Sequence, residues 1–189
     1  MNNLKRAVML SVLALMMLLG AGAQTAFAEE ISCTRTLGAV TVDNVRVPAG
    51  KTCTLNKTIV KGTVKVERNA TLYAKTARIN GNVQAEGAKL VSVTANTTVG
   101  GSIQIVQGGA ATINRARVNG DILFDDNTRA FRATNNKVGG NVQVFQNTGG
   151  VTISNNTIDG NLQCKENTPR PTGTGNIVKG SKEDQCARL

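Results

Sequence analysis

Apolar and polar positions alternate along most of this chain in short stretches that end at turn residues. One stretch starts two residues after a recurring glycine and reads apolar, polar, apolar, as in Val142-Gln143-Val144. A second follows nine residues later at Val151-Thr152-Ile153, and a single apolar position, here Ile158, comes two residues before the next glycine. Alternation with period two is typical of β-strands that bury one face. Because no helical period of apolar residues separates these stretches, the pattern predicts an all-β fold.

The glycine that precedes the first strand recurs at an almost constant interval. Seven glycines are separated by 19, 20, 19, 20, 20 and 20 residues, and they are Gly62, Gly81, Gly101, Gly120, Gly140, Gly160 and Gly180. A repeat of this length, built from strands and turns, predicts a solenoid in which each turn of chain packs only on its neighbours. The sequence therefore predicts a parallel β-helix of about seven rungs of 19–20 residues, with one continuous apolar interior.

In period and rung pattern, residues 38–180 resemble the right-handed parallel β-helix, or pectin-lyase-like, superfamily. A left-handed β-helix usually has a hexapeptide repeat, which is absent from this chain, so the right-handed form is favoured. Because one fold hosts many activities, the resemblance implies an architecture and only a loose range of functions.

Glycine and asparagine occupy two different corners of each predicted rung. The recurring glycines are expected where the chain turns between sheets, because glycine accepts a positive φ and leaves room for a close neighbour. Asn96, Asn135 and Asn155 each lie five residues before a recurring glycine, and Asn136 and Asn156 stand beside the last two. Asparagine tolerates the left-handed conformation, and amides in register can hydrogen-bond from rung to rung. We therefore expect a structural asparagine column rather than a binding site.

Residues 1–28 have the features of a signal peptide. Lys5-Arg6 precede an apolar run from Ala7 to Ala23, and Ala26-Phe27-Ala28 places small residues at the positions that a signal peptidase requires, so cleavage is expected before Glu29. The alternative is an uncleaved membrane anchor, because the run approaches the shortest length that spans a bilayer. No later segment is apolar enough to cross a membrane, so the mature chain is expected to be secreted or periplasmic.

The charge of the mature chain changes the range of expected partners. Without residues 1–28 the chain has 20 basic and 12 acidic residues, a net charge of +8 over 161 residues. Such a balance favours contact with anionic polysaccharide or another polyanion of the cell envelope. The alternative is that the charge serves only solubility. No nucleic-acid partner is expected in an exported chain.

Four cysteines are present, and export makes disulfides the expected state. The absence of histidine removes the usual co-ligand of a metal thiolate site. Three pairings are open, and we favour Cys33 with Cys53 and Cys164 with Cys186, because separations of 20 and 22 residues are close to one rung.

These pairs divide the mature chain into three parts. The expected parts are an N-terminal cap over residues 29–57, β-helix rungs over 58–164, and a C-terminal rung with its cap over 165–189. Each disulfide would then staple one end of the β-helix.

Candidates for catalysis are few. The chain has no histidine, which excludes serine-histidine and cysteine-histidine nucleophilic systems. The resemblance to the pectin-lyase-like superfamily still implies a polysaccharide lyase, which would use Arg or Lys as the base and Ca²⁺ to hold an acidic substrate. The weak candidates for Ca²⁺ ligands are Asp121, Asp125 and Asp126, and an ordinary polar turn explains them better. No cofactor is expected, and catalysis is the less favoured interpretation.

Two surface columns are the candidate binding residues. Gln84, Gln104, Gln143 and Gln163 are expected on one outer face, with Lys65 before them and Leu123 interrupting them. Arg78, Arg117 and Lys137 each lie three residues before a recurring glycine and are expected to form a basic column with Thr98 and Thr157. A row of cations can hold an extended anionic polymer. The alternative is an ordinary solvated face.

Three functional hypotheses follow. The favoured one is a non-enzymatic β-helix that serves as a structural or interaction module of the cell envelope and binds anionic polymers through its basic face. The alternative is a carbohydrate-active protein, either a minimal polysaccharide lyase or an acidic-glycan binder. A third is end-to-end self-assembly, as in bactofilins, which are similar only in architecture. Disulfide-linked caps argue against open ends and thus against the third hypothesis.

Overall fold

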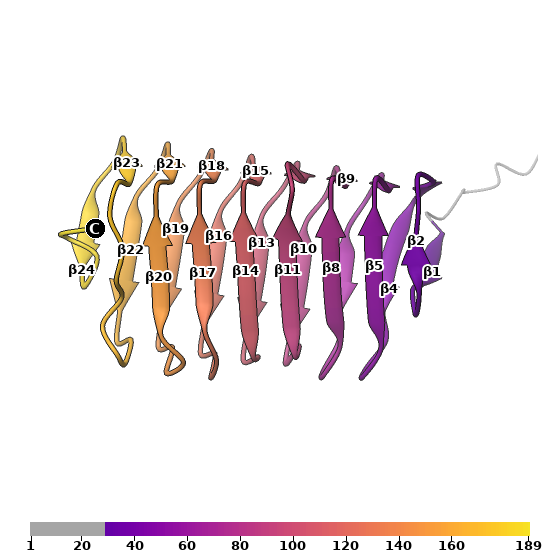
Figure 1. Ribbon diagram of the computed structural model, residues 1–189, viewed down its shortest axis with the longest axis horizontal. Coiled ribbons are helices and arrows are strands. Elements are labelled where there is room, and N and C mark those ends of the chain that lie inside the picture. The colour runs from indigo at the N-terminus through magenta and orange to yellow at the C-terminus, as the bar shows by residue number, and fades with distance from the viewer. Residues whose placement is uncertain (1–28) are drawn as a thin grey trace, which may run out of the picture.

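The computed structural model describes residues 29–189, which form a parallel β-solenoid of about seven turns (Figure 1). The expected signal peptide and its cleavage site up to Ala28 lie outside the described residues. Residues 29–189 contain strands and turns and no helix. The predicted all-β fold is therefore confirmed.

Each turn of the solenoid contributes one strand to each of three parallel sheets. Sheet A has nine strands: β1 (Glu30–Ser32), β4 (Asn44–Val47), β7 (Val64–Val66), β10 (Val83–Glu86), β13 (Ile103–Val106), β16 (Ile122–Asp125), β19 (Val142–Phe145), β22 (Leu162–Lys165) and β24 (Lys182–Asp184). Sheet B has seven strands: β2 (Thr36–Leu37), β5 (Thr52–Asn56), β8 (Thr71–Lys75), β11 (Leu90–Thr94), β14 (Ala110–Asn114), β17 (Phe131–Thr134) and β20 (Val151–Ser154). Sheet C has eight strands of two residues: β3 (Thr41–Val42), β6 (Ile59–Val60), β9 (Arg78–Ile79), β12 (Thr98–Val99), β15 (Arg117–Val118), β18 (Lys137–Val138), β21 (Thr157–Ile158) and β23 (Ile177–Val178).

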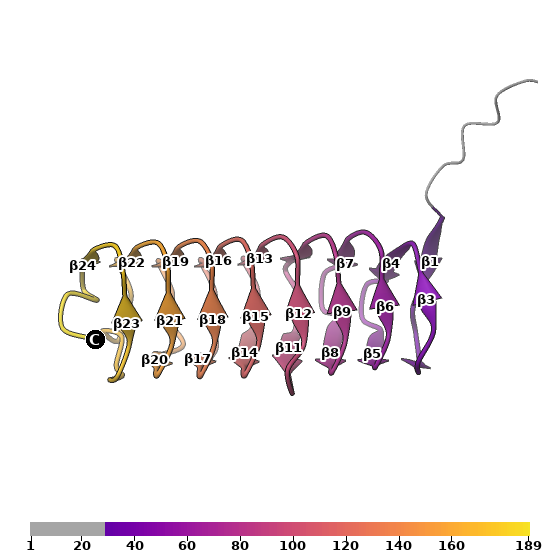
Figure 2. The same cartoon turned by 90° about the horizontal axis from the view of Figure 1, so that it is seen from above.

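The chain winds in the right-handed sense. In Figure 1 the strands of sheet B lie in front and run upward, those of sheet A lie behind and run downward, and the chain advances from right to left. Figure 2 shows sheet C, which connects the two, along the full length of the solenoid. The handedness agrees with the preference drawn from the period.

The predicted inward positions form a single apolar interior. Val142, Val144, Val151, Ile153 and Ile158, which come from one rung, are all buried, and the same positions are buried in the neighbouring rungs. The register pairs each inward residue with its counterpart one rung away, for example Val142 with Ile122. Because the inward side chains of each rung are covered by the rungs on both sides, no rung is stable alone.

The residue after each recurring glycine forms a polar ladder at the corner between sheets C and A. Its side chain accepts a hydrogen bond from the backbone N–H of the equivalent residue in the next rung, as from Ser102 N to Asn82 Oδ1 at 2.8 Å and from Asn141 N to Asp121 Oδ1 at 2.6 Å. The ladder runs through Asn44, Thr63, Asn82, Ser102, Asp121, Asn141, Asn161 and Ser181. A Cβ atom added to Gly101 or Gly140 would collide with such a side chain of the preceding rung. The glycines therefore supply room, and the positive φ angles fall elsewhere.

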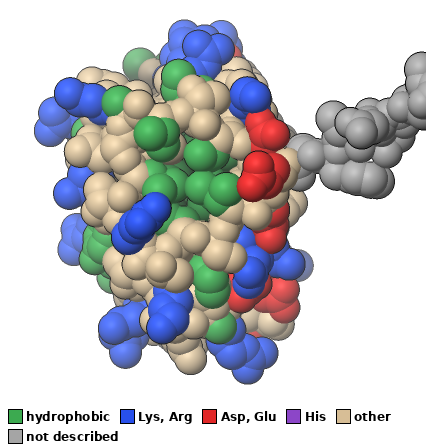
Figure 3. Space-filling view, turned by 90° about the vertical axis from the view of Figure 1, so that its right-hand side faces the viewer, with side chains coloured by type: hydrophobic (Ala, Val, Ile, Leu, Met, Phe, Trp, Pro, Cys, Tyr) green, Lys and Arg blue, Asp and Glu red, His purple; other side chains and the backbone are tan. Residues whose placement is uncertain are grey.

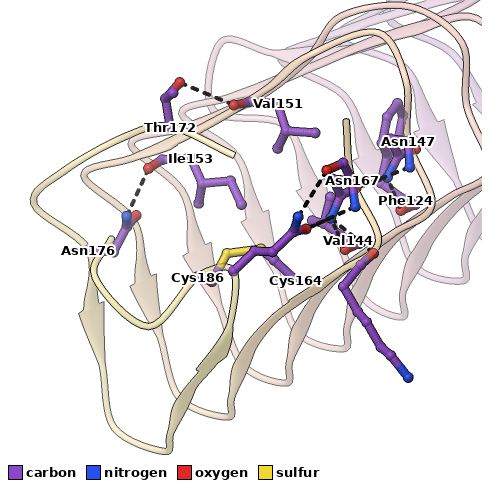
Figure 4. Close-up of a disulfide and its surroundings, with 12 residues drawn as sticks. Phe124, Val144, Asn147, Val151, Ile153, Cys164, Asn167, Thr172, Asn176 and Cys186 are labelled. Atoms are coloured by element: carbon purple, nitrogen blue, oxygen red, sulfur yellow. Dashed lines mark hydrogen bonds between the residues drawn. A yellow bond between two sulfur atoms is a disulfide. The ribbon is translucent and has the colours of Figure 1, made fainter. Parts of the chain in front are cut away.

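The predicted asparagine corner lies between sheets B and C. Asn96, Asn135 and Asn155 have φ angles of 63°, 57° and 56°, which places them in the left-handed region as expected. The buried rung-to-rung amide bonds belong to the next residue, because Asn136 Nδ2 donates to Asn156 Oδ1 at 2.9 Å, whereas Asn135 Nδ2 makes only an exposed bond to Asn114 Oδ1 at 3.4 Å. A second buried asparagine ladder, which was not predicted from the sequence, joins Asn127, Asn147 and Asn167 between sheets A and B. Figure 4 shows Asn147 and Asn167 of this ladder.

Both predicted disulfides are present, Cys33–Cys53 and Cys164–Cys186, with Cα atoms 5.4 and 5.2 Å apart. The segment expected to be the N-terminal cap, residues 29–57, carries β1 to β5 and continues all three sheets in register. These residues therefore form the first rungs of the solenoid. At the other end, the chain after β24 folds back so that Cys186 meets Cys164 (Figure 4).

Candidate functional site

Sheet C carries the predicted basic column on its outer face. Strand pairing places Arg78, Thr98, Arg117, Lys137 and Thr157 in one continuous row. The side chains of Arg78, Arg117 and Lys137 are exposed. Because neighbouring parallel strands lie about 4.8 Å apart, Arg117 and Lys137 place two cations at that spacing along the solenoid axis.

A flat strip of alternating asparagine and glycine residues lies beside this basic column. The strip contains the residues two positions further along each rung: Asn80, Gly100, Asn119 and Gly139. A Cβ atom at Gly100 or Gly139 would collide with the backbone carbonyl oxygen of Asn80 or Asn119, so these positions accept no side chain. The strip was not predicted from the sequence. The doublets Gly100-Gly101 and Gly139-Gly140 are nevertheless a signal for it, because the second glycine of each doublet belongs to the repeat whereas the first does not.

Ion pairs close the flat strip at both ends. Lys61 Nζ lies 2.9 Å from Asp43 Oδ1 before Asn80, and Lys179 Nζ lies 2.8 Å from Asp159 Oδ1 after Gly139. A hydrogen bond from Lys179, together with the charges of Lys179, Lys137 and Arg117, holds the pKa of Asp159 below its usual value. The positive field of the basic column thus reaches the end of the strip.

The cations of the basic column have no carboxylate partner within residues 29–189. The ion pairs in this part of the chain involve Arg46, Lys61, Lys165 and Lys179. Arg78 donates to Asn80 Oδ1 at 3.2 Å, which leaves its charge uncompensated. A row of exposed cations without carboxylate partners, beside a strip of asparagine and glycine, is suited to an extended anion.

Sheet A carries the predicted glutamine column, which has two different halves. Gln143 Nε2 donates to Gln163 Oε1 at 2.9 Å, and Gln163 Nε2 donates to Glu183 Oε2 at 2.7 Å, so the C-terminal half is an internal amide ladder. Gln84 and Gln104 are exposed and make no side-chain hydrogen bond to any residue in 29–189. Only these two amides of the column are free to bind a ligand through both oxygen and nitrogen.

Gln84 and Gln104 lie in an open groove of about 840 Å³. Its floor comes from the outer face of sheet A, with Lys65 and Leu123 on either side of the two glutamines. Its wall comes from Glu86 at the end of β10 and from the corner after the sheet A strands, where Arg68 and Gln107 lie. The glutamine column on the floor was predicted from the sequence, but the wall was not. Turn residues have no period-two pattern that would show which way their side chains project.

The three aspartates proposed as weak Ca²⁺ ligands do not converge. Asp121 precedes β16 at the corner between sheets C and A, whereas Asp125 and Asp126 lie at the other end of this strand. The Asp121 carboxylate is engaged by the backbone N–H and side-chain amide of Asn141. Burial and the charge of Asp126 raise the pKa of Asp125. No group of three metal-binding side chains occurs in the described part of the chain.

Comparisons with protein-family models, curated proteins and solved structures find no match to this chain. From Glu29 onward, no helix has the length and apolar character needed to span a membrane.

Proposed function

We propose that this protein is a non-enzymatic binding module of the cell envelope that holds an extended anionic polymer along sheet C. The observation that carries this proposal is the column of Arg78, Arg117 and Lys137, exposed and without carboxylate partners, beside the flat strip of Asn80, Gly100, Asn119 and Gly139. The fold contributes a rigid support on which the cations keep a constant spacing.

The shape of the basic face selects the type of ligand. Sheet C strands are only two residues long, so the face is narrow and accommodates one chain lying parallel to the solenoid axis. Because the attraction of successive cations for a linear polyanion adds along the row, affinity grows with the number of rungs that the polymer contacts. A compact anion touches one or two of these cations and gains little.

An extracytoplasmic location fits the covalent structure. Two disulfides join residues at the two ends of the solenoid, and such bonds persist in oxidising compartments. Anionic polysaccharide and other charged polymers of the cell envelope are the polyanions that an exported protein meets.

A charge-reversal experiment tests the proposal. Arg117→Glu with Lys137→Glu is expected to weaken binding of an acidic polysaccharide at least about tenfold, since two favourable surface contacts of up to about 1 kcal/mol each become repulsive. The matched control is Arg129→Glu with Lys89→Glu, which makes the same change in net charge at exposed corners between sheets A and B. Isothermal titration at low and high salt measures both, and wild-type binding should fall with salt because exposed charges are screened.

Equal binding by the charge-reversed protein and its control would contradict the role of sheet C. The control also separates a specific column from the effect of net charge alone. Thermal melting of each variant checks that the fold is retained.

A glycan-binding role for the sheet A groove is the second candidate. It is favoured by Gln84 and Gln104, whose free amides point into an open groove beside Lys65. Amides and a cation are suited to the hydroxyl and carboxylate groups of an acidic sugar. Neutral and acidic oligosaccharides in the same titrations distinguish the two faces, because binding to neutral sugars would not depend on Arg117 and Lys137. Release of unsaturated products would instead support a lyase.

A further inference from the structure

The N-terminal end of the solenoid exposes the end of its apolar interior. Ile31, Leu37 and Val42 of the first rung occupy inward positions but are only partly buried, and Val40 is 48% exposed. Their counterparts in the second rung, Val45, Leu55 and Val60, are fully buried. Figure 3 looks onto this end and shows a central hydrophobic patch surrounded by charged side chains.

The first strands also present unpaired backbone groups at this end. Within the described chain, β1, β2 and β3 are the outermost strands of sheets A, B and C and pair on one side only. The O atom of Glu29 and the N–H of Cys33 bond to β4, through Asn44 N at 2.9 Å and Arg46 O at 2.8 Å. Because hydrogen-bonding direction alternates along a strand, the peptide groups of Glu30 and Ser32 point out of the end. A free edge of this kind is a template for pairing with another strand.

The C-terminal end is more fully covered, in contrast, although Val178 of its outermost sheet C strand β23 is only partly buried. Lys182 and Asp184 of β24 stand in register with the buried Leu162 and Cys164, so charges occupy the inward positions of the last rung. The residues after β24 form a turn that is held by the Cys164–Cys186 disulfide and buries Leu189 to 9% exposure. Inward-pointing charges and a covering segment are devices that block edge-to-edge association.

We propose that the N-terminal end binds a second copy of the same chain, end to end, with the two β1 strands antiparallel about a two-fold axis. With Ile31 opposite Ile31 of the second copy, the outward peptide groups of Glu30 and Ser32 face each other and the two apolar interiors join. The bonds of Ile31 and its alternating neighbours to β4 remain intact, since only the outward groups are used. This interface is self-complementary, as a two-fold dimer requires.

The charges around β1 favour this occupant and this orientation. Glu29 and Glu30 lie at the start of β1, and Arg35 lies shortly after its end. Antiparallel pairing brings the start of one strand to the end of the other, so Glu29 of each copy approaches Arg35 of its partner, twice by symmetry, while Glu30 keeps its ion pair with Arg46. A parallel head-to-tail contact would instead bury Lys182 and Asp184 against Ile31, which carries a large desolvation cost.

The chain itself leaves little to cover this end once the signal peptide is removed. Glu29 is the single residue that would precede β1. The occupant therefore comes from another molecule, and the closed C-terminal end limits association to two copies. The proposal is independent of polymer binding, because sheet C residues Arg117 and Lys137 lie several rungs away from β1.

Light scattering after size exclusion tests the proposal on the exported protein, with its N-terminus fixed by mass spectrometry. The wild-type protein is expected at twice the mass of one chain. Ile31→Lys should give a monomer, because it places a charge where the two interiors join. The matched control is Ile177→Lys at a 66% exposed isoleucine of β23, near the closed end, which should remain a dimer. Ser32→Pro should also give a monomer, since it removes an outward N–H and spares the apolar interior.

A charge-reversal pair tests the orientation. Arg35→Glu should raise the dimer dissociation constant about tenfold or more, and adding Glu29→Arg should restore it, because Glu30 then stays in its ion pair with Arg46. Far-UV circular dichroism and thermal melting show whether each variant is folded, and titration with the acidic polysaccharide should be unchanged per chain in Ile31→Lys and Ser32→Pro, whereas Ile177→Lys adds a cation to the row of sheet C. A wild-type monomer throughout a concentration series, with or without residues 1–28, would overturn the proposal. So would oligomers that grow beyond two copies, or a dimer that persists in both Ile31→Lys and Ser32→Pro.

Discussion

Each recurring glycine leaves space for a side chain of the preceding rung. At Gly140 an added Cβ would collide with Asp121 Oδ1, the atom that accepts the hydrogen bond from Asn141 N. The same relation explains why the repeat is broken at the N-terminus. Asp43 holds the glycine position there, and the ladder position below it is Glu30, whose side chain bonds to Arg46 instead of projecting into the corner ladder. Glycine is needed only where the rung below projects a polar side chain into the corner.

Gly140→Ala is expected to destabilise the protein by about 1–3 kcal/mol, the usual cost of forcing an extra methyl group into a packed site. The control is Gly38→Ala, because a Cβ atom at Gly38 would meet no atom within 4 Å. This control should change stability by less than about 0.5 kcal/mol. Urea denaturation of both variants measures the difference. Similar midpoints for the two would show that the glycine column is not a packing requirement.

The period of the glycines could be predicted from the sequence, whereas the physical reason why glycine is needed at these positions could not. The sequence analysis allowed either a positive φ or a close neighbour. The structure assigns positive φ angles to other corner residues, such as Asn135 and Gln146, and the close neighbour to the glycines. Backbone angles of this kind do not alter an apolar pattern, so they leave no trace in hydrophobic periodicity.

Among the elements, the corners rather than the strands carry the polar bonds that fix the register of the rungs. Strand residues can slip by a full repeat of the apolar pattern at little cost in burial. Asn156 prevents such slips, because its Nδ2 donates to Ala133 O and Asn176 Oδ1 while its Oδ1 accepts from Asn136 N. Buried amides that bond to the rungs on both sides make the alternative registers costly.

Asn156→Ala should destabilise the solenoid by about 2–4 kcal/mol, because it leaves several buried backbone and amide groups without partners. Asn119→Ala is the matched control, since Asn119 is exposed and lies on the flat strip of sheet C. It should alter stability by less than about 0.5 kcal/mol. Thermal unfolding followed by circular dichroism compares the two. A fall in melting temperature of equal size in both would argue against a specific role for the buried ladder.

The whole molecule is a linear stack whose two ends differ. The cysteine pairing was predicted correctly from the spacing of one rung, because members of a pair one turn apart lie above each other. The same reasoning suggested that both ends are covered. A disulfide between neighbouring rungs staples them without covering the interior, so the state of each end depends on the residues in the inward positions. These are Ile31 at the open end and Lys182 with Asp184 at the closed end.

The stability of such a stack is expected to be lost from its ends when the disulfides are removed. Cys33→Ala with Cys53→Ala, and Cys164→Ala with Cys186→Ala, should each cost about 3 kcal/mol, because each bond closes a loop of roughly 20 residues in the unfolded chain. Since rungs interact only with their neighbours, the loss should be local. Hydrogen exchange followed by mass spectrometry should show faster exchange in β1 to β5 for the first variant and in β22 to β24 for the second. The central strands β10 to β16 should stay protected in both variants. A uniform rise in exchange across all rungs would instead show that the solenoid unfolds as a single unit.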